Sequence, residues 1–123
     1  MRKQFSAAFA LLLAVAGAIA HAAPLPAPAR AEVDALLARL QSSGCQFNRN
    51  GSWYSGGEAK DHLLRKLEYL EKKDMVRNAE QFIDLGAATS SSSGKPYMVK
   101  CGAAAPVESK AWLTTELKAI RAR

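Results

Sequence analysis

Histidine and cysteine are scarce in this chain of 123 residues, which has two of each. Beyond the first 22 residues the sole histidine is His62, so a site built from several histidines is excluded there. Cys45 and Cys101 form no Cys-x-x-Cys motif, and neither has a histidine nearby at ligand spacing. The sequence therefore indicates no metal and no cofactor.

Long hydrophobic runs are also scarce, because the chain has a single one, at residues 7–20. Arg2 and Lys3 precede this run, and a small-x-small sequence follows it at 20–22. This order is typical of a signal peptide at 1–22, cleaved after Ala22. An uncleaved anchor is the alternative, but the run is shorter than the ~20 residues that a membrane-spanning helix needs. We expect a periplasmic or secreted protein with no membrane span after cleavage.

Charge of one sign is not concentrated in any segment. The formal net charge is +6, and Arg2 and Lys3 supply two of these charges. The other basic residues are interspersed with acidic ones, without the clustering beside aromatic residues that is typical of nucleic-acid binding. We therefore expect no nucleic-acid partner, although weak attraction to anionic envelope components stays open.

The two cysteines are best explained by one disulfide bond. Two cysteines in an exported protein most simply pair with each other. A Cys45–Cys101 bridge closes a long loop, which in the chain-entropy model stabilises the fold by roughly 4 kcal/mol.

The spacing of apolar residues predicts a single small α+β domain over residues 31–123, after a Pro-rich extended leader at 23–30. Helices are expected at 31–41, 58–72, 75–87 and 109–121, and strands at 45–49 and 97–101. Four helices would then pack on a short two-stranded sheet, in the order α-β-α-α-β-α. Gly44 is placed for a left-handed helix cap, and Asp74 for the N-cap of the third helix.

The Asn50-Gly51 pair leaves the number of strands open. Asn-Gly is a strong two-residue hairpin signal, and a hairpin would make 52–54 a third strand. Alternatively, the turn leads directly into the next helix. We favour the second interpretation, because Ser55-Gly56-Gly57 shortens any return strand.

Glu58 and His62 are the candidate catalytic residues. They lie four apart on a predicted helix and so share one face, which suits an acid–base pair or two metal ligands. No third ligand is evident, and a simple surface contact is the alternative. The chain shows no complete catalytic set, so we favour a protein without enzymatic activity.

Arg49 is a candidate anion-binding residue. Its guanidinium group can hold a carboxylate or phosphate with two hydrogen bonds, or it can pair with Glu58 or Asp61. Trp53 and Tyr54 would form a platform for a sugar or peptide if they are exposed, or part of the core if they are not.

The serine-rich segment 90–95 ends in Gly94-Lys95 but lacks the spacing of a phosphate-binding P-loop. A serine nucleophile with His62 as its base is disfavoured, because no Gly-x-Ser-x-Gly motif is present. A polar turn is the simpler interpretation.

Several short motifs together resemble the YfeK-like family of small secreted bacterial proteins of unknown function. The resemblance covers residues 31–120 and rests on Phe47-x-Arg49-Asn50-Gly51, Glu58-Ala59-x-x-His62-Leu63-x-x-Lys66, Ala79-Glu80-x-Phe82-Ile83 and Ser91-x-Ser93-Gly94-x-Pro96-Tyr97-x-Val99. It implies a periplasmic domain with no established activity. The positions that it marks for testing are Arg49, Asn50, Glu58, His62, Lys66, Ser93, Gly94 and Tyr97.

Three hypotheses follow from the sequence. The first is a monomeric, non-enzymatic module that binds an envelope component or a protein through these polar residues. The second is a small hydrolase or metal-dependent enzyme that uses Glu58 and His62. In the third, Arg49, Glu58 and His62 form a structural polar network and the function lies elsewhere.

Overall fold

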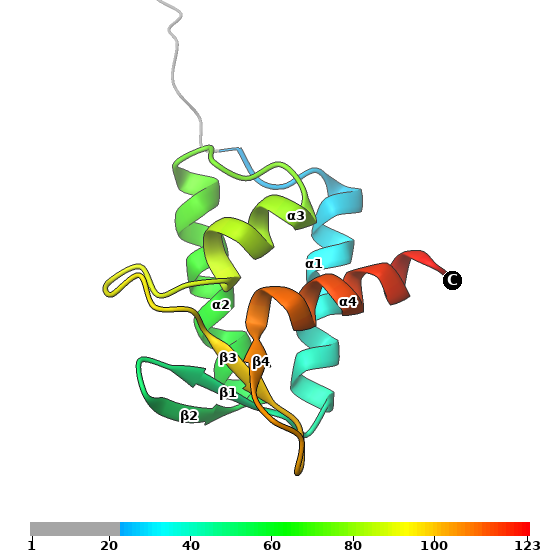
Figure 1. The fold of residues 1–123 in the computed structure, drawn as a ribbon. Helices are drawn as coiled ribbons and strands as arrows, with labels where there is room; N and C mark the ends of the chain where they lie inside the picture. The colour runs from blue at the N-terminus through cyan, green and yellow to red at the C-terminus, as the bar shows by residue number, and fades with distance from the viewer. Residues whose placement is uncertain (1–22) are drawn as a thin grey trace, which may run out of the picture.

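Two long helices lie side by side above a small antiparallel sheet (Figure 1). The computed structural model describes residues 23–123, so the predicted signal peptide at 1–22 lies outside the described residues. The helices of this part are α1 (Ala27–Ser42), α2 (Gly56–Lys72), α3 (Ala79–Phe82), the π-helix η1 (Ile83–Ala87) and α4 (Ser109–Arg121). The strands are β1 (Gln46–Arg49), β2 (Ser52–Ser55), β3 (Met98–Lys100) and β4 (Val107–Glu108). The expected α+β class is confirmed.

The sheet has four strands in the described part of the chain, in the order β2-β1-β3-β4, rather than the expected two. Asn50 and Gly51 have positive φ angles of 53° and 87° and close a β1–β2 hairpin. The hairpin alternative is therefore correct, and the favoured direct turn into α2 is wrong. β4 was not predicted, because its two residues are too short to show any alternation.

The predicted disulfide bond joins Cys45 to Cys101. The two residues lie one position beyond the Gln46–Lys100 pair of the β1–β3 ladder, with their Cα atoms 4.2 Å apart. The bond therefore fastens the two central strands at one end.

The core lies between the inner face of the sheet and the helices. Phe47 and Val99 pair across β1 and β3, and both are 1% exposed. The helices contribute the buried side chains of Val33, Leu36, Leu37, Leu40, Leu63, Leu67, Phe82, Ile83, Leu113 and Leu117. Gly56 lets α2 approach α1 closely, since a Cβ atom there would clash with the carbonyl oxygen of Leu40.

Helix α1 begins within the Pro-rich segment, four residues before its expected start. Pro28 lies in its first turn, where a missing N–H costs no intrahelical hydrogen bond. The preceding Leu25 is buried, and its backbone N–H donates to Oε2 of Glu71 at 2.8 Å. Residues just before the helix are thus packed on α2. At the other end, Gly44 has the expected positive φ angle, 74°.

Helix α2 is fixed at both ends by capping motifs. Ser55 Oγ accepts from the backbone N–H of Glu58 at 3.1 Å, and the Glu58 carboxylate accepts from the N–H of Ser55 at 2.9 Å. This reciprocal pair is a capping box. At the C-terminus Asp74 has a φ angle of 55°, and Met75 donates its N–H to the carbonyl of Leu70 at 2.9 Å. The left-handed conformation of Asp74 and this hydrogen bond are typical of a Schellman motif.

The expected helix at 75–87 is wrong at its start. Asp74 ends α2 instead of capping the next helix, and Asn78 is the N-cap, accepting from the N–H of Gln81 at 2.8 Å. The four residues of α3 then continue into η1. Gly86 fits there against Leu70, since a Cβ atom would lie 3.1 Å from its Cδ1.

We expect the double substitution Cys45→Ala/Cys101→Ala to lower the free energy of unfolding by about 2–4 kcal/mol, because the unfolded chain regains the freedom of a long loop. Urea denaturation of the oxidised proteins measures this difference. Dithiothreitol should destabilise the wild type but leave the double variant unchanged. Equal midpoints for the two oxidised proteins would contradict the prediction.

We expect Ser55→Ala to lower the free energy of unfolding by about 1 kcal/mol, because the first turn of α2 loses an N-cap acceptor. Glu58→Gln should cost less than Glu58→Ala, since glutamine can also complete a capping box. Glu68→Ala, at an exposed position of the same helix, is the matched control. Wild-type stability in Glu58→Ala would show that Glu58 does not cap the helix.

Candidate functional site

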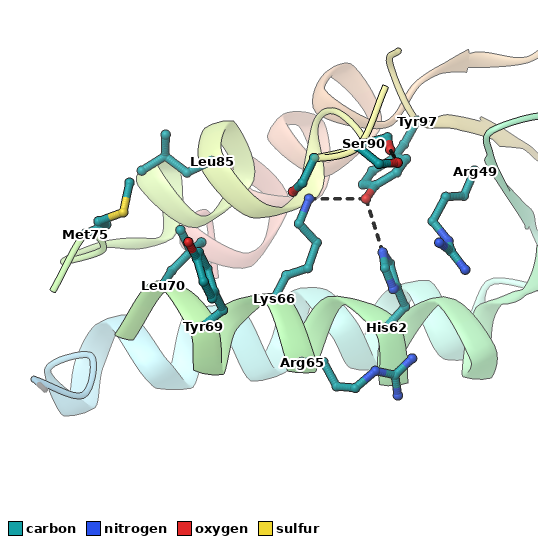
Figure 2. Close-up of a pocket in the computed structure, with 12 residues that line it drawn as sticks. Arg49, His62, Arg65, Lys66, Tyr69, Leu70, Met75, Leu85, Ser90 and Tyr97 are labelled. Atoms are coloured by element: carbon teal, nitrogen blue, oxygen red, sulfur yellow. Dashed lines mark hydrogen bonds between the residues drawn. The ribbon is translucent and has the colours of Figure 1, made fainter. Parts of the chain in front are cut away.

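An open cavity of about 610 Å³ lies between α2, the end of β1 and the loop at 88–97 (Figure 2). Its volume falls within the range of small-molecule sites, about 300–1,000 Å³. The residues that line it are Arg49, His62, Arg65, Lys66, Tyr69, Leu70, Met75, Leu85, Ser90, Ser91, Ser92 and Tyr97. The cavity thus has basic, hydroxyl-bearing and apolar walls, and no carboxylate among its lining residues.

One side of α2 forms the floor of the cavity. His62, Lys66 and Tyr69 follow one another at spacings of four and three, so they lie in a row along one side of the helix (Figure 2). The neighbouring row of Leu63, Leu67 and Leu70 is buried in the core. The apolar row therefore fixes the direction in which the polar row points.

Tyr97 connects the core to the cavity. The residue is 1% exposed, and the centre of its ring lies 5.0 Å from the centre of the Phe47 ring. Its hydroxyl oxygen lies 3.1 Å from Nε2 of His62 and accepts a hydrogen bond from Nζ of Lys66 at 3.2 Å. Lys66 also donates to the carbonyl oxygen of Thr89 at 3.0 Å. Tyr97, which comes directly before β3, therefore meets two side chains of α2 at its hydroxyl group.

Arg49 occupies the opposite wall at the end of β1. Residues 45, 47 and 49 alternate onto the inner face of the sheet, so Arg49 follows Phe47 toward the cavity. Its guanidinium carbon lies 5.1 Å from the centre of the Tyr54 ring. Within residues 23–123, no ion pair involves Arg49, Arg65 or Lys66. The expected alternative, a pair of Arg49 with Glu58 or Asp61, is therefore not formed.

Burial disfavours the charged forms of three side chains in this cluster, and nearby positive charges modify its effect. Burial is the main cause that lowers the pKa of His62 to about 4, and the positive charges of Arg49, Lys66 and Arg65 lower it further. Burial and then Arg49 also lower the pKa of Lys66. Burial raises the pKa of the Tyr97 hydroxyl, while Arg49 opposes that rise. At neutral pH His62 is therefore neutral and Tyr97 is protonated.

The serine-rich loop is attached to the β1–β2 hairpin by side-chain hydrogen bonds. Nδ2 of Asn50 donates to Oγ of Ser90 at 3.0 Å, and Oγ of Ser93 donates to Oδ1 of Asn50 at 2.6 Å. Gly94 has a φ angle of 74°, which glycine adopts readily, and its N–H donates to the carbonyl of Ser90 at 2.8 Å. These contacts hold the loop beside the cavity, as a built turn and not a P-loop.

The eight positions marked by the family resemblance divide into three groups in the structure. Arg49, His62, Lys66 and Tyr97 line the cavity, whereas Asn50, Ser93 and Gly94 shape the loop. Glu58 caps α2 and borders a second, smaller cavity of about 250 Å³ that also includes Asp61. This second cavity shares Arg49, His62 and Arg65 with the first, so the acidic side chains border a neighbouring cavity and not the one described above.

Several lining residues carried no sequence prediction of function. Arg65, Tyr69, Met75 and Leu85 belong to this group. Tyr69 is a large aromatic residue among charged ones on the exposed side of a helix, which was the one available signal. Trp53, proposed as part of a platform with Tyr54, is 41% exposed, while Tyr54 lies under Arg49.

Two of the alternative chemistries, metal binding and a serine nucleophile with His62 as its base, lack the partner side chains that they need among the described residues. Within residues 23–123, no three His, Cys, Asp or Glu side chains gather closely enough to hold a metal ion. His62 contacts Tyr97, and Oγ of Ser90 contacts Asn50 and Ser92, so no serine–histidine pair is formed by these two residues. The arrangement instead offers hydrogen-bond donors and positive charge to an anion.

Comparison with known proteins places the chain in an uncharacterised family. The model of the family of unknown function DUF5329 matches residues 27–121. The chain is 38% identical over 98 residues to the uncharacterized protein YfeK of Salmonella typhimurium strain LT2, covering 79% of this chain and 77% of that protein. No solved structure matches. This agrees with the resemblance noted in the sequence: the chain belongs to the DUF5329 family, whose function is unknown.

Proposed function

We propose that this protein is a non-enzymatic binding protein of the cell envelope, which takes an anionic ligand into the cavity between α2, β1 and the 88–97 loop. The observation that carries this proposal is the charge of the lining: Arg49, Arg65 and Lys66 with no carboxylate. An anion of matching size would supply the negative charge that the lining residues lack.

The electrostatics of the cluster favour binding of an anion. Positive charges that face one another without a counter-ion repel, and the lowered pKa values of His62 and Lys66 reflect burial first and then this repulsion. An anion placed among them would relieve the repulsion and favour the protonated forms. Binding of the anion and protonation of His62 are therefore thermodynamically linked.

The hydrogen-bond inventory supports the same conclusion. The ammonium group of Lys66 can only donate, so the Tyr97 oxygen accepts from it. Tyr97 and neutral His62 then have two polar hydrogens between them and use one in their mutual contact. One donor is left over in either histidine tautomer, and together with the third ammonium hydrogen of Lys66 it can serve a ligand.

An extracytoplasmic location is supported by the disulfide bond. The disulfide bond is typical of proteins that fold in an oxidising compartment. None of the helices described in residues 23–123 is long and apolar enough to cross a membrane. Together with the signal peptide predicted at 1–22, the disulfide bond supports a periplasmic or secreted protein, which we expect to act as a monomer.

The first test measures the pKa of His62 by NMR with and without sulfate, whose charge is constant between pH 4 and pH 8. We expect a pKa near 4 without sulfate and a clear upward shift when sulfate binds. The sign follows because a bound dianion stabilises the imidazolium form. Glu58 and Asp61 border the neighbouring cavity, which His62 also lines, and they are present in both measurements.

Chloride at the same ionic strength is the control for general screening, and His62→Gln assigns the resonance. An equal shift in chloride and sulfate would mean screening alone. No shift in sulfate, at concentrations up to tens of millimolar, would overturn the proposal for this anion class.

We expect Lys66→Gln and Arg49→Gln each to weaken sulfate binding by about tenfold, the effect of losing one charge-assisted hydrogen bond of about 1.5 kcal/mol. Lys72→Gln removes a positive charge from an exposed position of the same helix and is the matched control. Thermal melts of all three variants separate loss of binding from loss of the fold. If Lys72→Gln weakened binding as much as Lys66→Gln, the ligand would be responding to net charge and not to this cavity.

A further inference from the structure

We infer that the ligand is amphipathic: an anionic head group lies among Arg49, Lys66 and Tyr97, and a single apolar chain lies over Tyr69, Met75 and Leu85. This inference rests on the proposed function and adds the class of ligand to it. It depends on how polarity is distributed within the one cavity.

The lining of the cavity changes from polar to apolar along α2 (Figure 2). His62 and Lys66 lie at its polar end, beside Tyr97 and Arg49, whereas Tyr69 and Leu70 lie one turn farther on. At about 1.5 Å per residue, the floor from residue 62 to residue 70 is roughly 12 Å long. A ligand that fills it would meet charged groups at one end and hydrocarbon at the other.

The apolar end is unusually exposed. Tyr69, Met75 and Leu85 are 57%, 47% and 45% exposed, and they are three of the five large hydrophobic residues found exposed in residues 23–123. Single exposed hydrophobic residues are ordinary, but several that gather at the rim of one cavity are typical of a binding site. The rim is therefore the natural place for the apolar part of a ligand.

Local backbone features place two of these residues at the rim. The Schellman motif at the end of α2 turns the chain so that Met75 follows Asp74 back beside Leu70. The π-helix η1 carries Leu85, and Gly86 lets it approach Leu70 closely. π-Helical turns are frequent at functional sites. The exposure of Met75 and Leu85 thus follows from specific structure around the cavity.

Charge complementarity selects this ligand class over an uncharged one. A neutral hydrocarbon would leave Arg49 and Lys66 without a counter-ion, and a small inorganic anion would leave the rim exposed. A single-chain amphiphile with a carboxylate, sulfate or phosphate head satisfies both ends. A protein partner covering the rim is a different occupant, and the test below distinguishes it.

The test compares three probes by isothermal titration calorimetry at pH 7.5: decanoate below its micellar concentration, acetate and decanol. Decanoate has both parts, acetate has the head group alone, and decanol has the chain alone. We expect decanoate to bind about a hundredfold more tightly than acetate, if about half of the added methylene surface is buried. It should also bind about a hundredfold more tightly than decanol, which lacks the charge-assisted hydrogen bonds to Arg49 and Lys66, each worth about tenfold. Circular dichroism confirms that the fold is unchanged by the probe.

Substitutions at the apolar and polar ends of the cavity separate the contributions of the chain and of the head group to binding. Leu85→Ser should weaken decanoate binding by about fivefold to tenfold and leave the effect of sulfate on the pKa of His62 unchanged. Lys66→Gln should weaken both. Val107→Ser is the matched control, because Val107 is 44% exposed on β4 and does not line the cavity.

The outcomes also separate this inference from the proposed function. If sulfate shifts the pKa of His62 but decanoate binds no more tightly than acetate, the amphipathic ligand is wrong and anion binding stands. If decanol binds as tightly as decanoate, the charged end does not recognise a head group and the inference fails. If neither sulfate nor decanoate binds, both proposals fail, and the exposed rim is left for a protein partner.

Discussion

Both the fold and the cavity depend on the contacts that the buried side chain of Tyr97 makes with the core and with α2. The ring lies in the core, with its centre 5.0 Å from that of the Phe47 ring, and its hydroxyl group contacts His62 and Lys66 on α2. The disulfide bond fastens β1 to β3 at the opposite end of the same ladder. Because the sheet is held at both ends, Arg49 at the end of β1 has a fixed position relative to α2. Binding sites need this kind of support, since rigid elements position side chains more closely than loops do.

The loop at 88–97 is supported by a second set of contacts. Asn50 at the hairpin tip reaches Ser90 and Ser93, so the turn residue that closes the hairpin also fastens the loop beside the cavity. Lys66 adds a hydrogen bond to the carbonyl of Thr89. Several positions of the family resemblance that do not touch the cavity therefore still shape it. A structural role and a binding role are compatible here, because the network that positions Lys66 leaves one of its donors unused.

Sequence patterns predicted the regular elements better than the turns or the cavity. The apolar spacing of 58–72 and 109–121 identified α2 and α4, because a helical stripe of buried leucines is a strong periodic signal. Asp74 was misassigned because aspartate suits both a helix N-cap and a left-handed turn, and only the tertiary course of the chain selects between them. The resemblance marked Arg49, His62, Lys66 and Tyr97, which the fold brings together. Met75 and Leu85 were not identified, because periodicity locates the buried face of an element but not which exposed residues share a rim.

The cavity differs from other parts of the described structure in how its positive charges are neutralised. Elsewhere in the described structure several basic residues have carboxylate partners: Arg121 pairs with both Glu32 and Glu80, and Arg39 pairs with Glu116. In the cavity, by contrast, Arg49 and Lys66 face each other without a carboxylate, beside a histidine whose pKa is lowered to about 4. Such a cluster does not help the unliganded protein to fold, because burial and repulsion both oppose the charged forms. A fold that pairs Arg39 and Arg121 with carboxylates yet leaves Arg49 and Lys66 without one, at the polar end of a cavity with an exposed apolar rim, fits the ligand proposed above better than a role in stability.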